Sequence, residues 1–217
     1  MKIRFLGHSA FLLTASDTTR IITDPYVPGA FGGAITYAPI AEPADFITVS
    51  HNHIDHNNVT GVPGDHKTIR SAGERKAGGV TVTGFDCFHD ENSGRDRGTN
   101  VIFVFEDAGL RLAHGGDLGH VPTAQAQAIG RVDVLLVPVG GHFTIGPNEA
   151  HETMRLLGAR VTIPMHFKTS KTDMPIVGVE EFLKGQGNVK RAGKSEIELT
   201  PATLPDAPTI IVLEHAL

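Results

Sequence analysis

The sequence predicts a layered α/β fold of the α+β type, in which helices lie outside two mixed β-sheets. Segments with the apolar pattern of short strands clearly outnumber helical segments, and the expected helices lie between strands in the second half of the chain. At 217 residues the chain is long enough to bury a core, so one domain spanning residues 1–217 is expected. Because a sheet must bury its apolar face against another layer, this pattern favours a sandwich.

The first part of the chain predicts a β-meander followed by a long loop. Three short apolar runs lie within residues 2–23, separated by turns. Residues 25–43 contain several prolines and glycines without sustained periodicity, which favours an active-site rim or lid over a packed element. A surface loop without function is an equally good interpretation. A strand is then expected over residues 46–49.

Strands and helices alternate in the second part of the chain. Further strands are expected over residues 67–70, 80–88, 99–106, 109–114, 132–137 and 160–165, and three weak strands extend toward residue 213. Helices are expected over residues 122–129, 148–157 and 179–184. The helix over 148–157 has Asn148 as its expected N-cap, and Gly158 is expected to end it.

A cluster of metal-ligand residue types follows the strand over 46–49, namely His51, His53, Asp55 and His56. In an extended segment, side chains two apart point the same way, so the first two histidines can bind one ion from one side. Asp55 and His56 fall on the following turn and suit a second ion. Imidazole and carboxylate are ligands that zinc and similar divalent metals prefer. A polar, histidine-rich loop is the weaker alternative.

Ligand-type residues also follow three later predicted strands, as His89, Asp117 and His166. If these strands leave the sheets along one edge, the three side chains converge with the cluster at residues 51–56. Taken alone, each would more simply be a satisfied polar residue or a turn former. Their positions after strands favour a ligand role.

The motif His-x-His-x-Asp-His at residues 51–56 resembles that of the metallo-β-lactamase superfamily. Gly7-His8-Ser9 and Thr23-Asp24-Pro25 are similar to motifs of the small, uncharacterised metal-dependent hydrolases of that superfamily. Neighbours of these hydrolases include ascorbate-phosphate lactonases and N-acyl-phosphatidylethanolamine phospholipase D. The resemblance implies the four-layer αβ/βα sandwich over nearly the whole chain, and it does not specify a substrate.

The resemblance also implies a ligand set for two divalent metal ions. Zinc is the expected metal, with manganese, nickel or iron as alternatives. The first ion would be bound by His51, His53 and His89, the second by Asp55, His56 and His166, and Asp117 would bridge the two.

A site of this kind predicts a dinuclear hydrolase. Metals lower the pKa of bound water to about 7, so a metal-bridging hydroxide is expected to attack a small ester, lactone or phosphodiester. Asp55 is the expected catalytic residue, because it can orient the nucleophile and carry a proton while binding the second ion. Three alternatives stay open: an iron protein with redox chemistry, a metal-binding protein without turnover, and a nuclease or phosphodiesterase acting on nucleic acid.

Three further polar residues are candidates for supporting roles. Asp24 is expected to accept the second N–H of a metal-bound histidine, with a simple turn role as the alternative. His8 is a weaker candidate of the same kind. His142 could contact substrate or act as an acid, although a solvated loop histidine explains it equally well.

Several cations near the predicted ligands could bind an anionic substrate, although charges in surface loops are usually only solvated. They are Arg95, Arg97, Lys168 and Lys171. The single cysteine, Cys87, is expected to be inert packing.

Composition narrows the partners. The net charge of −5 argues against a large nucleic-acid footprint, so a small-molecule substrate is expected. An anionic substrate is one option. One cysteine excludes an internal disulfide and fits a reducing compartment. The N-terminus lacks the apolar core of a secretory signal and no apolar run is long enough to span a bilayer, so a cytoplasmic protein is expected. The resemblance to lactonase-type proteins makes a homo-oligomer plausible.

Overall fold

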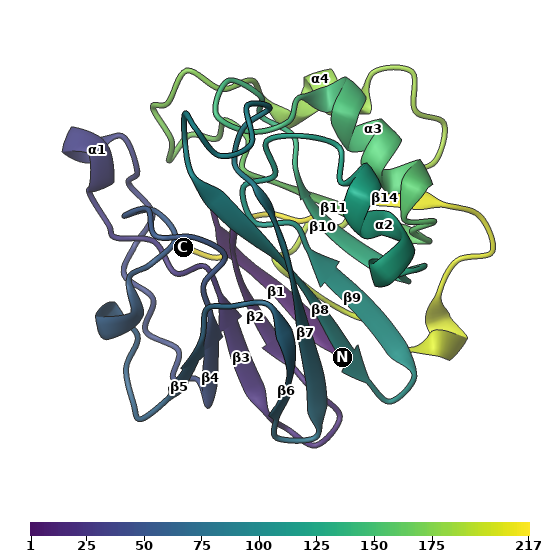
Figure 1. The fold of residues 1–217 in the computed structure, drawn as a ribbon, viewed down its shortest axis with the longest axis horizontal. Coiled ribbons are helices and arrows are strands. Elements are labelled where there is room, and N and C mark those ends of the chain that lie inside the picture. Colours follow the sequence, from purple (N-terminus) through teal and green to yellow (C-terminus); the bar gives the residue numbers. More distant parts are fainter.

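Two stacked β-sheets form the centre of the computed structural model, which describes all residues from 1 to 217 (Figure 1). The first sheet has the order β13-β1-β2-β3-β4-β5 and consists of β1 (Lys2–Gly7), β2 (Ala10–Thr14), β3 (Arg20–Thr23), β4 (Phe46–Thr48), β5 (Lys67–Ile69) and β13 (Glu196–Glu198). The second has the order β12-β14-β11-β10-β9-β8-β7-β6 and consists of β6 (Gly73–Ala77), β7 (Val80–Phe88), β8 (Thr99–Asp107), β9 (Leu110–His114), β10 (Val134–Pro138), β11 (Val161–Met165), β12 (Val189–Arg191) and β14 (Thr209–Val212).

The alternation of side chains along the first strands explains how the six-stranded sheet is buried on both faces. The strands β1, β2 and β3 pair antiparallel, which confirms the predicted meander. Phe5 and Phe11 lie opposite each other in the ladder, with ring centroids 4.9 Å apart, and both join the core between the two sheets. Leu12 and Ile22, one position out of phase, contribute to a second apolar cluster on the outer face.

The eight-stranded sheet combines an antiparallel and a parallel part. The strands β6 to β9 pair antiparallel, whereas β9, β10, β11 and β14 pair parallel. All residues of β10 and β11 are buried, as expected for parallel strands covered on both faces.

Helices lie against the eight-stranded sheet (Figure 1). They are α2 (Thr123–Ile129), α3 (Pro147–Leu156) and α4 (Val179–Leu183), and each contributes a buried side chain to the main core. The predicted N-cap of α3 is wrong, because the helix begins at Pro147 with Gly146 as N-cap. Glu149 accepts the Gly146 backbone N–H at 3.2 Å and thereby satisfies a free donor at the helix start. None of the helices has the length and apolar character needed to cross a membrane.

The segment 25–44 covers the outer face of the six-stranded sheet and contains only the short helix α1 (Ala30–Gly33). Tyr26, Ile35, Tyr37 and Ile40 are buried there, so part of residues 25–43 is packed, contrary to the expectation of a rim or lid. Phe31 and Ala34 instead line a cavity together with His53 and His89, as expected of a rim. The segment's lack of periodicity follows from its irregular backbone, not from exposure. The predicted fold class is confirmed, with an irregular segment providing most of one outer layer.

Candidate metal centre

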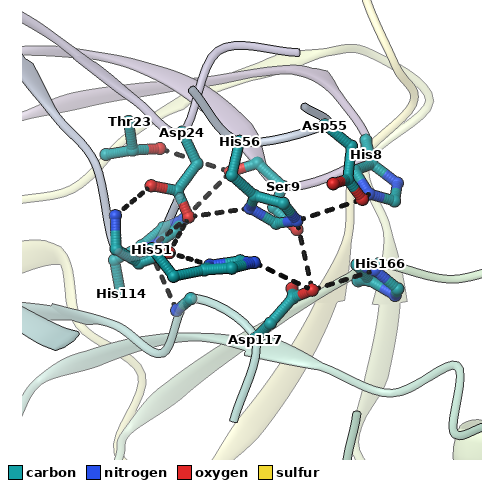
Figure 2. A network of polar contacts seen from close by, with 12 residues as sticks. His8, Ser9, Thr23, Asp24, His51, Asp55, His56, His114, Asp117 and His166 are labelled. Atoms are coloured by element: carbon teal, nitrogen blue, oxygen red, sulfur yellow. Dashed lines mark hydrogen bonds and ion pairs between the residues drawn. The ribbon is translucent and has the colours of Figure 1, made fainter. Parts of the chain in front are cut away.

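The predicted ligands reach one site from the ends of strands in both sheets. Figure 2 shows His51, Asp55, His56, Asp117 and His166 converging. His51, His53, Asp55 and His56 lie in the loop after β4. His89 directly follows β7, Asp117 follows β9, and His166 directly follows β11. The structure therefore brings all seven of these side chains together.

The carboxylate of Asp117 lies at the centre of the cluster. Its Oδ2 is 3.2 Å from the Nε2 of His56, 3.3 Å from that of His89 and 3.4 Å from that of His166. The Nε2 of His51 lies 3.8 Å from the same oxygen. This oxygen therefore faces imidazoles from both of the predicted ligand groups.

Ligand-type atoms fall into two main groups within 4.8 Å of one another, His51, His53 and His89 on one side and His8, Asp55, His56 and His166 on the other. A further group joins Asp24 to His51 and His56.

Several buried atoms of the cluster have no hydrogen-bond partner within the protein. They are the Nε2 atoms of His51, His56 and His166 and the Oδ1 atoms of Asp55 and Asp117. A buried polar atom without a partner is costly, and imidazole nitrogens converging with carboxylate oxygens form the donor set that divalent cations prefer. The residues present therefore fit bound metal ions.

Burial sets the protonation of most imidazoles in the cluster. Burial and the neighbouring His56 lower the pKa of His51 to about 3. Burial, opposed by Asp117, lowers the pKa of His166 to about 4, and burial also lowers that of His89. These three imidazoles are neutral near pH 7, which is the form that binds metal. His56 behaves differently, because Asp117 and Asp55 outweigh burial and hold its pKa well above the usual value.

Asp24 connects the cluster to the end of β3. It is fully buried, and its Oδ2 lies 3.0 Å from the Nδ1 of His56. Ser50 donates its backbone N–H to Oδ1 at 2.7 Å and its hydroxyl to Oδ2 at 2.5 Å. The Ser50 Oγ also lies 2.9 Å from the Nδ1 of His51. Asp24 thus contacts one predicted ligand, His56, directly and a second, His51, through Ser50. Such contacts orient the imidazoles toward a metal ion.

His8 lies inside the cluster and not at its edge. Its Nε2 is 3.0 Å from the Oδ2 of Asp55, and its ring centroid lies 4.2 Å from that of His166. The backbone at His8, Asp24 and His166 has φ of 55°, 41° and 49°, so three non-glycine residues of one site occupy the left-handed region. Such strain is concentrated at functional sites, where the surrounding structure holds it.

His142 lies apart from the cluster. Its side chain is exposed and lines a smaller neighbouring pocket that also includes His89 and Arg97. Its proposed contact with substrate stays a prediction.

Two residues without a predicted role support the site. Asn100 accepts the backbone N–H of Asp117 at 3.0 Å and donates to the carbonyl of Gly115 at 2.8 Å, so it fixes the loop that carries Asp117. His114 is fully buried, with its Nε2 2.9 Å from the Ser9 carbonyl oxygen. A polar residue inside an apolar strand was the one signal in the sequence that could have revealed either of them.

A cavity of about 610 Å³ opens onto the cluster. Five predicted ligands line it, namely His53, Asp55, His89, Asp117 and His166. Of the four cations considered from the sequence, only Arg97 lines the cavity. Lys168 instead pairs with Asp173 at 3.4 Å.

A two-sheet sandwich with histidine and aspartate side chains gathered at the strand ends is the architecture of a metal-dependent hydrolase. Residues 2–166 match the family model described as the β-lactamase superfamily domain. The chain therefore belongs to this family, within the metallo-β-lactamase superfamily, as the sequence predicted.

Curated relatives and solved structures agree with this assignment. A UPF0173 metal-dependent hydrolase of Thermococcus onnurineus is 30% identical over 195 residues, covering 78% of this chain and 85% of that protein. A UPF0173 metal-dependent hydrolase of Methanoculleus marisnigri is 32% identical, covering 78% of this chain and 82% of that protein. The structure of a proposed zinc-dependent hydrolase of the metallo-β-lactamase superfamily from Thermotoga maritima superposes with a TM-score of 0.80 at 39% identity, covering 99% of this chain and 98% of that one. The chain is thus a metal-dependent hydrolase.

Proposed function

We propose that the protein is a dinuclear metal-dependent hydrolase that cleaves a small ester, lactone or phosphodiester, with residues 1–217 acting as one domain. The observation that carries this proposal is the position of the Asp117 carboxylate, which faces imidazoles of both ligand groups at 3.2 to 3.8 Å. The first ion would be held by His51, His53 and His89, and the second by Asp55, His56 and His166, with Asp117 between them. Zinc is the expected metal. A cytoplasmic location and a homo-oligomeric state stay predictions.

Divalent ions bound in this site would supply a water of lowered pKa and polarise the oxygen of the bond to be cleaved. The protein's own residues hold and orient the reactants. Asp55 lines the cavity, its Oδ2 contacts His8, and its buried Oδ1 has no partner. A carboxylate oxygen in this position can accept a proton from the attacking water while His8 fixes the rotamer of the side chain. Asp24 and Ser50 fix the orientation of His56 and His51.

The test is a hydrolysis screen with generic phosphodiester, lactone, carboxylic ester and thioester substrates on zinc-loaded protein. Wild type is expected to turn over at least one class, whereas Asp55→Ala and Asp117→Asn are expected to lose at least about a hundredfold in kcat/KM. His66→Ala, a histidine outside the cluster, is the matched control and should retain wild-type activity.

Equal activity of Asp117→Asn and wild type would contradict the assignment of Asp117. Redox-active iron in the purified protein, together with no hydrolysis of any class, would overturn the hydrolase proposal in favour of redox chemistry.

A further inference from the structure

We propose that the substrate is an amphipathic monoanion, with an apolar group packed against the cavity wall formed by Phe31, Ile54, Phe143 and Met174 and an anionic group bound by Arg97. This inference names the substrate class for the site above and rests on the proposed function. It follows from the lining of the cavity outside the metal cluster.

The apolar wall combines side chains from four separate segments of the chain. Phe31 comes from α1, Ile54 from the histidine-rich loop, and Phe143 and Met174 from the loops that follow β10 and β11. Phe31 is 53% exposed and Ile54 is 48% exposed, which places them among the few large apolar side chains that the protein leaves open to solvent. Both line this cavity, so their exposed surface is available to a ligand.

The backbone at Phe31 is in an unfavourable conformation. Its φ of 55° lies in the left-handed region, which bulky residues rarely adopt. Positive φ also occurs at Gly29, Gly32 and Gly33, so the whole turn has the unusual path that presents Phe31. A bulky residue kept in such a conformation at a cavity entrance indicates a functional contact.

Arg97 is the only arginine or lysine among the residues that line the cavity, and it forms no ion pair with a carboxylate. Asp173, the carboxylate of the cavity lining that lies outside the ligand cluster, pairs with Lys168 at 3.4 Å and not with Arg97. Arg97 therefore offers the cavity an uncompensated positive charge beside the cluster.

The position of Arg97 is fixed by contacts on both its backbone and its side chain. The carboxylate of Asp90 accepts the backbone N–H groups of Asn92, Gly94, Asp96 and Arg97 at 2.8 to 3.0 Å, which closes residues 90–97 into one ordered turn. The guanidinium donates to the carbonyl of His142 at 3.2 Å and lies 5.8 Å from the centroid of the Phe143 ring. It therefore has a defined position next to the apolar wall.

Size and charge together limit what the cavity can bind. A volume of about 610 Å³ is that of a small-molecule site. One uncompensated arginine matches a single negative group, whereas a nucleic-acid backbone needs a run of cations. A fully polar ligand would leave the apolar wall exposed to water, and a neutral ligand would form no ion pair with Arg97.

The test uses two p-nitrophenyl esters with acyl chains of the same length, hexanoate and the adipate monoester, which differ in a terminal methyl or carboxylate. Wild type is expected to prefer the adipate monoester by about tenfold or more in kcat/KM, as a charge-assisted hydrogen bond predicts. Arg97→Gln should lose this preference through a raised KM, and Arg97→Lys should retain part of it. Arg95→Gln is the matched control, because Arg95 is exposed on the same loop and does not line the cavity.

The apolar wall is tested with the neutral esters from acetate to hexanoate. We expect kcat/KM to rise by about threefold for each added methylene in wild type, and Phe31→Ser to flatten this rise. Leu156→Ser, an exposed apolar residue away from the cavity, should leave the series unchanged.

A binding measurement separates failure of this inference from failure of the hydrolase proposal. Calorimetric titration of the zinc-loaded protein with 4-phenylbutyrate and with 4-phenylbutan-1-ol should show at least about tenfold tighter binding of the anion, lost in Arg97→Gln. This result without hydrolysis of any ester would leave the substrate class standing and overturn only the reaction. Equal binding of anion and alcohol, or anion binding unaffected in Arg97→Gln, would overturn the inference even if esters are hydrolysed.

Discussion

Replacement of Asp24 by asparagine tests how the protein orients its predicted ligands. Asp24 accepts hydrogen bonds from the Ser50 backbone N–H, the Ser50 hydroxyl and the Nδ1–H of His56. An amide of the same shape keeps one oxygen, so at least one donor must face the new NH₂ group. Because the site is fully buried, that donor is left without a partner.

The expected cost has two parts. Loss of hydrogen bonds to a buried charged group lowers the free energy of unfolding by about 2 to 4 kcal/mol in the metal-free protein. Loss of the orienting contact lowers zinc affinity by about 10- to 100-fold. Urea unfolding in the presence of a chelator measures the first effect, and competition with a chromophoric chelator measures the second.

Asp107→Asn is the matched control for this experiment. Asp107 is also buried and accepts the N–H and the hydroxyl of a serine, Ser16, at 2.9 and 2.6 Å, but it lies at the far end of β8 from the cluster. It should lose stability without losing zinc affinity. Wild-type zinc affinity in Asp24→Asn would refute the orienting role.

Burial and close packing around the ligand cluster make three further predictions. Burial lowers the pKa of His51 to about 3 and that of His166 to about 4, from the ordinary value of 6.5, so the unfolded chain binds more protons than the folded chain as pH falls. The metal-free protein should therefore lose about 1.4 kcal/mol of stability per pH unit for each of these histidines between about pH 6.5 and 4. Urea midpoints that stay constant over this range would contradict the buried neutral state of the two imidazoles. Burial raises the pKa of Cys87 to about 12. We therefore expect no reaction of the native thiol with iodoacetamide near pH 8 and rapid reaction in urea, measured by mass spectrometry. Labelling of the native protein would show that the strand opens. A Cβ at Gly119 would collide with the backbone of His89 and Asp90. Gly119→Ala should therefore lower the free energy of unfolding by about 2 kcal/mol or more and weaken zinc binding. Gly187 has open space around it, so Gly187→Ala should change neither quantity.

The strands were predictable where burial imposes a pattern. The alternation at the start of β1 and the continuous apolar runs of β2 and β10 follow directly from which faces are covered. The strand β6 was not predicted, because its residues Gly73 to Lys76 are exposed and it pairs only with β7 at the edge of the sheet. An edge strand of this kind carries charges in place of an apolar alternation.

The covering segment 25–44 shows where local sequence carries too little information. Its buried tyrosines are held by partners distant in the chain: the hydroxyl of Tyr37 lies 2.8 Å from that of Thr169. In the sequence this segment shows several prolines and glycines and no sustained apolar period. The packing of this segment depends on tertiary contacts that local propensity does not encode.

In the candidate site, too, local features were predictable from the sequence and long-range contacts were not. The ligand cluster at residues 51–56 is local and therefore visible in the sequence, and strand ends indicated His89, Asp117 and His166. The supporting contacts are long-range: Asn100 reaches Asp117 across 17 positions and His114 reaches Ser9 across 105. Neither pairing has a spacing rule, so only the folded chain shows it.

The most direct test of the metal centre is the number of zinc ions per chain, counted by native mass spectrometry after reconstitution and removal of excess metal. Wild type and the remote control His151→Ala should carry two ions, and Asp117→Asn should carry fewer. One ion or none in wild type, or two firmly bound ions in Asp117→Asn, would contradict a paired site organised around that carboxylate.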